Sequence, residues 1–329
     1  MSAKDDSAVL SLRDVRVGYR RHREVREIVR GVDLDVLAGE KVGVVGESGS
    51  GKTLTMLSVL RLLPRPLEVL GGQIRFEGRG LTDLGERDME SIRGAKVAMV
   101  YQDPMTSLNP LLRVRTQVVE TLRSHGASDA AARARTREVL GQVGFSDPER
   151  VEVAFPHELS GGMVQRVMIA IAIATSPRLL VADEPTTALD VTIQQQILDL
   201  VDSLQSSTAM SVVWVSHDLG VIARLVDKVF VMYAGRVVEH APTVQLFARP
   251  AHPYSHALLG SLPGPEVEHR AQLTQIGGSP PDPTLLGPGC PFRARCPFAF
   301  DRCAEEEPPL ADRGDGSFAA CWKEPVAWL

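Results

Sequence analysis

The sequence predicts an α/β fold built on a mostly parallel sheet, and two patterns along the chain support this. Continuous apolar runs rich in β-branched residues recur at VGVVG (42–46), VAMVY (97–101), LLVAD (179–183), VVWVS (212–216) and VFVMY (229–233). Such runs, which do not alternate with polar residues, are typical of strands buried on both faces of a parallel sheet. Helical stretches such as 53–63 and 191–204 separate them, which is the alternation expected of an α/β fold.

The third observation is a glycine-rich sequence directly after the first run. Residues 46–53 read GESGSGKT and match the pattern G-x-x-x-x-G-K-[ST] between a strand and a helix. Backbone N–H groups of such a loop surround phosphate oxygens, and the N-terminus of the following helix attracts the same anion. We expect Lys52 to reach the β- and γ-phosphates and the Thr53 hydroxyl to bind Mg²⁺. The residues predicted to contact the nucleotide here are Gly46, Ser48, Gly49, Gly51, Lys52 and Thr53.

Two carboxylates follow the third apolar run, in LLVADEP (179–185). Asp183 is placed to hold Mg²⁺ at the end of a strand. Glu184, one residue further, is predicted to act as the general base that orients or deprotonates the attacking water. A strand-end acidic turn would be the plain alternative, and the presence of GESGSGKT in the same chain disfavours it.

Composition limits the class of protein. The chain has 329 residues, 44% hydrophobic and 23% charged, with a net charge of −5. These values exclude a disordered chain, a collagen and a coiled coil, and the length corresponds to about two domains. The acidic balance disfavours a basic nucleic-acid binder, so no nucleic-acid partner is expected. We expect neither a membrane span nor a signal peptide, because no apolar stretch is long enough and the start lacks a basic flank.

Composition also changes along the chain. The segment 103–161 contains the Arg- and Ala-rich sequence AARARTREVLGQV and no convincing strand, so it is predicted to be an inserted helical subdomain. Of the 22 prolines, 14 lie after residue 240, a density that prevents long helices and central strands. We therefore divide the chain into a nucleotide-binding core (1–102 and 162–240), the helical subdomain (103–161) and a loop-rich C-terminal extension (241–329).

All 4 cysteines lie in this extension, at Cys290, Cys296, Cys303 and Cys321. Disulfides are not expected in a reducing compartment. Four thiolates suit Zn²⁺ or a 4Fe-4S cluster, and the spacing C-x5-C-x6-C-x17-C lacks the C-x2-C pairs of a common zinc ribbon. Four reduced structural thiols are the remaining alternative.

The sequence LSGGMVQR (159–166), taken together with GESGSGKT and LLVADEPTTALD, resembles an ABC transporter ATP-binding subunit. The resemblance covers about residues 8–245 and implies a P-loop ABC cassette. It also implies that Ser160, Gly161 and Gly162, at the start of a helix, bind the γ-phosphate of an ATP held by the opposite subunit. Val164 departs from the arginine that is common at this position and is expected to tune the helix.

Four further positions take their roles from the resemblance. Tyr19 resembles the aromatic residue that stacks on adenine, and Gln102 the glutamine that contacts Mg²⁺. Asp190 resembles an aspartate at the dimer seam, and His217 the histidine that contacts the γ-phosphate. The alternatives are an ordinary strand aromatic for Tyr19, a surface side chain for Gln102, a helix N-cap for Asp190 and a packed histidine for His217.

The branch of the family is indicated by QDPMTSLNP, TTALDVTIQ and the extension GCPFRARCPFAFDRC, which resemble the oligopeptide/dipeptide importer ATPases. The resemblance implies a 4Fe-4S cluster on the four cysteines and an ATPase at the cytoplasmic face of the membrane. The implied partners are a second, paralogous ATPase, two transmembrane permease subunits and an extracytoplasmic solute-binding protein.

Other functions stay open at this point. The importer could carry nickel or another small solute. A soluble ABC ATPase switch in DNA repair or translation would have the same catalytic motifs, although such proteins usually carry two cassettes or a long coiled coil. A regulatory module with an inactive ATPase is disfavoured, because Lys52, Asp183, Glu184 and His217 are all present.

Overall fold

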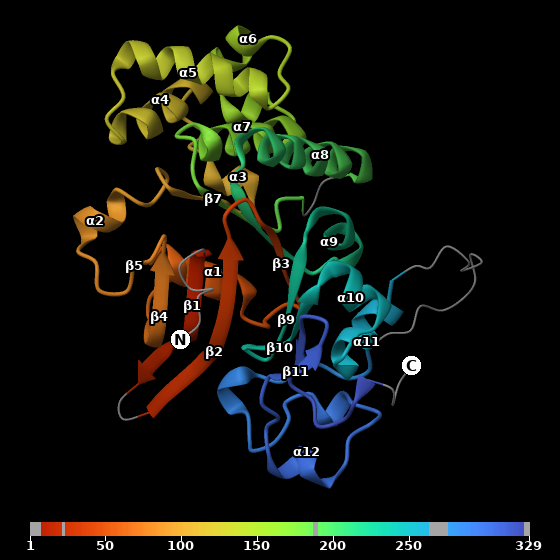
Figure 1. The fold of residues 1–329 in the computed structure, drawn as a ribbon. Coiled ribbons are helices and arrows are strands. Elements are labelled where there is room, and N and C mark those ends of the chain that lie inside the picture. The colour runs from red at the N-terminus through yellow and green to blue at the C-terminus, as the bar shows by residue number, and fades with distance from the viewer. Residues whose placement is uncertain (1–7, 22–23, 187–189, 263–275, 326–329) are drawn as a thin grey trace. The chain divides into compact units, whose positions relative to one another are not determined.

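The computed structural model describes residues 8–21, 24–186, 190–262 and 276–325. The chain forms two compact units (Figure 1). The first consists of Met1–Val36, Lys41–Thr82 and Val215–Leu329, and the second of Leu37–Glu40 and Asp83–Trp214.

The first unit contains an antiparallel sheet in the strand order β2-β1-β4-β5. Its strands are β1 (Ala8–Arg21), β2 (Glu24–Leu37), β4 (Glu68–Phe76) and β5 (Arg79–Gly80). β1 and β4 pair closely, with Leu10 opposite Phe76 and Val17 opposite Val69. The long apolar runs did not predict this sheet, because its strands alternate buried and exposed residues over much of their length.

Five further strands of the first unit lie next to one another in a different sheet, in the order β11-β12-β10-β9-β3. They are β3 (Lys41–Val45), β9 (Lys228–Tyr233), β10 (Arg236–Pro242), β11 (Ala311–Gly314) and β12 (Ser317–Ala319). β3 and β9 are parallel, with Val44 opposite Phe230, and both are almost wholly buried. Two of the predicted strands are thereby confirmed as neighbours in a parallel arrangement.

The helices of the first unit are short. They are α1 (Lys52–Val59), α9 (Leu219–Leu225), α10 (Thr243–Ala248), α11 (Pro253–Gly260) and α12 (Asp301–Glu305). In the C-terminal extension α10 and α11 are followed by the 3-10 turns η3 (Pro283–Leu285) and η4 (Arg293–Arg295) and then by α12. The hairpin β11–β12 joins the extension to the core, because β12 pairs antiparallel with β10.

The second unit contains the parallel strands β6 (Val97–Val100) and β7 (Leu179–Asp183) and residues 211–214 of β8 (Ser211–Ser216). Its helices are α2 (Glu86–Glu90), α3 (Pro104–Ser107), α4 (Val114–Ser124), α5 (Asp129–Gln142), α6 (Pro148–Val153), α7 (Gly161–Ile173) and α8 (Val191–Thr208), with one 3-10 turn, η2 (Pro156–Glu158). Helices α4, α5 and α6 pack on one another (Figure 1), and α4 and α5 also contact α7. The predicted helical segment 103–161 is helical, and no strand lies in it.

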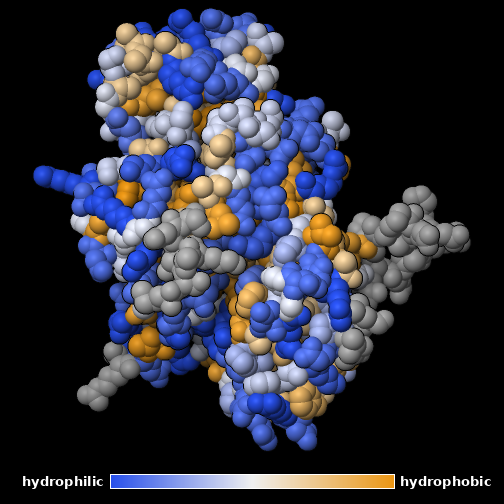
Figure 2. Space-filling model, viewed as in Figure 1, coloured by the Kyte–Doolittle hydropathy of each residue, from blue (hydrophilic) through white to orange (hydrophobic). Residues whose placement is uncertain are grey.

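The face of the protein in Figure 2 is mainly hydrophilic, with hydrophobic side chains in small separate groups. Within the described residues, no helix combines the length and the apolar character needed to cross a membrane.

Candidate functional site

The predicted phosphate loop lies in the first unit and joins β3 to α1. Gly46 has a φ of 151°, and a Cβ atom there would lie 2.2 Å from the carbonyl oxygen of Met232, so only glycine fits. The Lys52 side chain is buried, and its Nζ donates hydrogen bonds to the carbonyl oxygens of Gly46 at 2.7 Å and Glu47 at 3.0 Å. Ser48 and Gly49 at the middle of the loop are exposed. The loop therefore has the close backbone packing and the lysine that phosphate binding requires.

His217 and Tyr19 also belong to the first unit. His217 is exposed and lies between the end of β8 and the start of α9. The next residue, Asp218, caps α9 by accepting hydrogen bonds from the amides of Gly220 and Val221. The backbone directly after His217 is thus fixed by the helix cap. Tyr19 lies in β1 and is half-buried; its predicted contact with adenine stays a prediction.

The predicted acidic residues lie in the second unit, at the carboxyl end of β7. Asp183 is the last residue of the strand and is only 2% exposed. Glu184 follows with a φ of 46°, a left-handed conformation that costs a non-glycine residue roughly 1–2 kcal/mol. Gln102, just beyond β6, donates a hydrogen bond from Nε2 to Glu184 Oε2 at 3.1 Å. The structure thus brings together two residues that lie 82 positions apart, because β6 and β7 are parallel neighbours that end at the same edge.

The LSGGM sequence begins helix α7, with exposed Ser160 as the N-cap residue. A Cβ atom at Gly162 would lie 2.7 Å from Ile193 Cγ2, so glycine allows α7 and α8 to pack closely. Val164 is fully buried in α7, which suits an apolar residue at this position. Ser160 and Gly161 leave the first amides of the helix at the surface, where an anion could bind.

Asp190 is the N-cap residue of α8 and accepts a hydrogen bond from the amide of Ile193 at 2.9 Å. The alternative interpretation of this residue, a helix cap, is therefore confirmed. A role at a dimer seam is compatible with the cap and stays a prediction.

The four cysteines line one cavity together with Phe292, Phe300 and Trp322. Burial raises the pKa of Cys290 to about 11, and burial likewise raises the pKa values of Cys296 and Cys321. Proximity of the other thiols raises all three pKa values further, so the sulfur atoms lie near one another. Over the described parts of the chain, no group of three or more His, Cys, Asp or Glu side chains could hold a metal ion as it stands. The donor set fits a metal centre chemically, but its geometry is not that of a formed one.

Sequence patterns missed two residues that touch the phosphate loop. Tyr254 and Arg295, both in the C-terminal extension, bond to Glu47 inside GESGSGKT. No local motif marks either residue, because the contacts bridge more than 200 positions of the sequence.

Comparison with known proteins identifies the family. Residues 29–187 match the family described as ABC transporter, and residues 238–303 match the oligopeptide/dipeptide transporter C-terminal region. A probable peptide ABC transporter ATP-binding protein of Sinorhizobium fredii is 47% identical over 317 residues, which cover 96% of this chain and 95% of that protein. The chain belongs to the oligopeptide/dipeptide group of ABC transporter ATP-binding subunits. The predicted family, fold class and ATPase activity are thereby confirmed.

Other relatives agree with this assignment. The oligopeptide transport ATP-binding protein OppD of Bacillus subtilis is 43% identical over 316 residues, covering 95% of this ABC transporter subunit and 88% of OppD. Among solved structures, the dimeric ATP-binding cassette MJ0796, bound to ADP and Pi, is similar with a TM-score of 0.63 and 29% identity. The match covers 71% of this chain and 98% of the cassette. These similarities favour a transporter subunit over a soluble switch in DNA repair or translation.

Proposed function

We propose that this ABC ATPase powers the uptake of oligopeptides or dipeptides through separate transmembrane subunits. The observation that carries the proposal is the 47% identity to a peptide ABC transporter ATP-binding protein over almost the whole chain. The similarity includes the C-terminal region, for which residues 238–303 match the oligopeptide/dipeptide model. Nickel or another small solute has no comparable support.

The residues of the phosphate loop are proposed to bind ATP. Backbone amides of the loop after Glu47 and the α1 N-terminus would surround the β- and γ-phosphates. Lys52, which now bonds to carbonyl oxygens of its own loop, would transfer its hydrogen bonds to phosphate oxygens. His217 is proposed to contact the γ-phosphate and Tyr19 the adenine.

In the second unit, Glu184 is proposed as the general base for water attack. The hydrogen bond from Gln102 orients its carboxylate, and the backbone of Glu184 is left-handed, with a φ of 46°. Mg²⁺, when bound, neutralises charge on the phosphate oxygens. Thr53, Gln102 and Asp183 carry the oxygen ligands that this ion prefers. Ser160, Gly161 and Gly162 are proposed to act on the ATP of a second ATPase, with Asp190 at the seam.

The proposed assembly contains a second, paralogous ATPase, two transmembrane permease subunits and an extracytoplasmic solute-binding protein. The chain would then lie at the cytoplasmic face of the membrane as a peripheral subunit. To test this, the chain is co-expressed with candidate membrane subunits, and ATPase activity of the purified complex is measured with di- and oligopeptides. Stimulation by peptides is expected. Stimulation by Ni²⁺ alone, or purification without membrane subunits, would refute the peptide importer.

The four cysteines are proposed to hold a 4Fe-4S cluster, with Zn²⁺ as the alternative metal. In support, the chain's only cysteines line one cavity in its proline-rich extension. The extension has little core of its own, so metal binding would contribute to its folding. Anaerobically purified protein is expected to be brown with about four irons per chain, and Cys296→Ser is expected to lose this colour. Stoichiometric zinc without iron would reject the cluster.

A further inference from the structure

Glu47, the second residue of the phosphate loop, is bound through both its backbone and its side chain by the C-terminal extension. Its amide donates a hydrogen bond to the hydroxyl of Tyr254 at 2.9 Å. Its carboxylate forms two bonds with Arg295, from Nη1 to Oε2 at 2.6 Å and from Nη2 to Oε1 at 2.8 Å. All these residues belong to the first unit.

Burial and hydrogen bonds fix the Arg295 side chain in this position. It is only 4% exposed, although Glu47 is 26% exposed. Its other N–H groups donate to the carbonyl oxygens of Gly277 at 2.9 Å and Ile276 at 3.3 Å and to the hydroxyl of Tyr233 at 3.4 Å. The guanidinium of an arginine is charged at all physiological pH values. A buried arginine with two parallel bonds to a carboxylate is a rigid and directional contact.

Tyr254 is equally constrained. It lies in the first turn of α11 and is fully buried. Its ring packs against Tyr233, with ring centres 4.6 Å apart, and against Phe292 at 5.4 Å. Because the Glu47 amide is bonded to Tyr254, this N–H points to the extension, and the phosphate cradle is left to the later amides of the loop.

The two contacts control both the charge and the backbone of the phosphate loop. A carboxylate in a loop that binds a polyanion repels it, and the Arg295 guanidinium neutralises this charge. The carbonyl oxygen of Glu47 accepts hydrogen bonds from Lys52 Nζ at 3.0 Å and from the Ser50 amide at 3.2 Å. Holding Glu47 therefore also holds the groups that surround Lys52.

We propose that Arg295 and Tyr254 are positioning residues for ATP binding, through which the C-terminal extension shapes and neutralises the phosphate loop. Neither residue touches the nucleotide; both act through Glu47. The extension is thus a part of the ATP site and not only an appendage.

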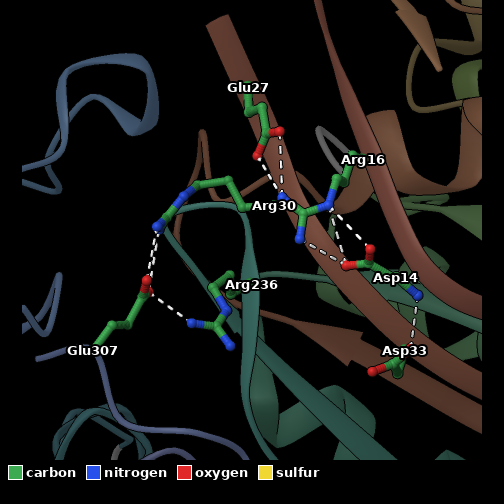
Figure 3. A network of polar contacts seen from close by, with 7 residues as sticks. All are labelled: Asp14, Arg16, Glu27, Arg30, Asp33, Arg236 and Glu307. Carbon is green, nitrogen blue, oxygen red and sulfur yellow. Dashed lines mark hydrogen bonds and ion pairs between the residues drawn. The ribbon is translucent and has the colours of Figure 1, made fainter. Parts of the chain in front are cut away.

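A second anchor provides a matched control. Glu307 of the extension bonds to Arg30 of β2 at 2.8 Å and to Arg236 of β10 at 3.0 Å, as Figure 3 shows. This pairing also fastens the extension to the first unit by an arginine–carboxylate contact, but it does not involve Glu47. Glu307→Gln therefore loosens the extension and leaves the charge of the phosphate loop unchanged.

The test compares Arg295→Met, Glu47→Gln, the double variant and Glu307→Gln in the full chain within its purified transporter. The KM for MgATP and the kcat for hydrolysis are measured separately. Arg295→Met is expected to raise KM roughly tenfold, because the carboxylate of Glu47 is left uncompensated beside the phosphates. The change in kcat is expected to stay within about twofold. In the double variant the KM is expected to return most of the way to the wild-type value. In Glu307→Gln it is expected to stay near the wild-type value.

An unchanged KM in Arg295→Met, no recovery in the double variant, or an equal rise in Glu307→Gln would each overturn the proposal. If Arg295→Met does not fold, Arg295→Lys and Tyr254→Phe replace it. Lysine keeps the charge and is expected to change KM less than about threefold, and loss of the Tyr254 hydroxyl is expected to raise KM roughly threefold. A wild-type KM in Tyr254→Phe, or a KM in Arg295→Lys raised tenfold or more, would then refute the role.

Discussion

The buried carboxylate of Glu239 makes the stability of the first unit depend on pH. Glu239 is fully buried in β10, and its two oxygens accept hydrogen bonds from the amides of Ala251 at 2.7 Å and His252 at 2.8 Å. These amides precede α11, the helix that carries Tyr254. Burial raises the pKa of Glu239 from 4.5 to about 7, although the two hydrogen bonds and the charge of Arg313 oppose the rise.

Proton binding decides whether the stability rises or falls with pH. Because the folded state binds this proton more tightly than the unfolded state, the stabilisation is fully present below pH 4.5 and is lost as the pH rises through about 7. Between pH 5 and pH 8 this loss amounts to about 2–3 kcal/mol. Burial lowers the pKa values of His240 to about 4 and His252 to about 3, so both histidines act in the opposite direction as the pH falls. The contribution of the Glu239 carboxylate is therefore obtained from the difference in the free energy of unfolding between wild type and a Glu239 variant.

The assay is urea unfolding of wild type and Glu239→Gln, followed by circular dichroism between pH 5 and pH 8. Glutamine does not titrate and resembles the protonated carboxyl group in size and in having a single strong acceptor oxygen, so its contribution to stability is expected to stay constant between pH 5 and pH 8. Relative to this variant, wild type is expected to gain about 2–3 kcal/mol of stability between pH 8 and pH 5. Glu305→Gln, at an exposed position of the extension, is the control and should show a constant difference. A stability difference between wild type and Glu239→Gln that does not change with pH would refute the reasoning.

Three further predictions concern the second unit. Glu184→Gln is expected to slow ATP hydrolysis by roughly 10²–10⁴-fold while ATP still binds; turnover close to wild type would remove Glu184 from the role of base. Ser160→Arg is expected to prevent ATP-dependent dimers, measured by light scattering, and to leave nucleotide binding by the single chain unchanged. A large loss of affinity in the single chain would contradict action on the opposite ATP. Gly162→Ala brings a methyl group to 2.7 Å from Ile193 Cγ2, so the free energy of unfolding is expected to fall by about 1–3 kcal/mol; an unchanged unfolding midpoint would show that α8 can move away.

Several features could be predicted from the sequence because their physics is local. The five apolar runs were all confirmed as strands β3, β6, β7, β8 and β9. The loop GESGSGKT has the expected place between β3 and α1, since strand, glycine turn and helix are adjacent in the chain. The segment 103–161 is helical as predicted, while its limits as a subdomain stay a prediction. Asp183 and Glu184 lie where a buried strand ends, which its hydrophobic pattern alone located.

The antiparallel sheet β2-β1-β4-β5 could not be predicted in this way, because its strands carry mixed patterns and depend on pairing partners far along the chain. The same holds for the extension. Its prolines and cysteines indicated a loop-rich region, but no pattern in the sequence indicated that Arg295 bonds to Glu47 across 248 positions. A sequence motif can predict a site whose residues lie in one strand and the turn that follows it. Only tertiary packing decides which distant guanidinium neutralises a carboxylate, because that contact depends on how α11, η4 and the phosphate loop meet in the folded unit.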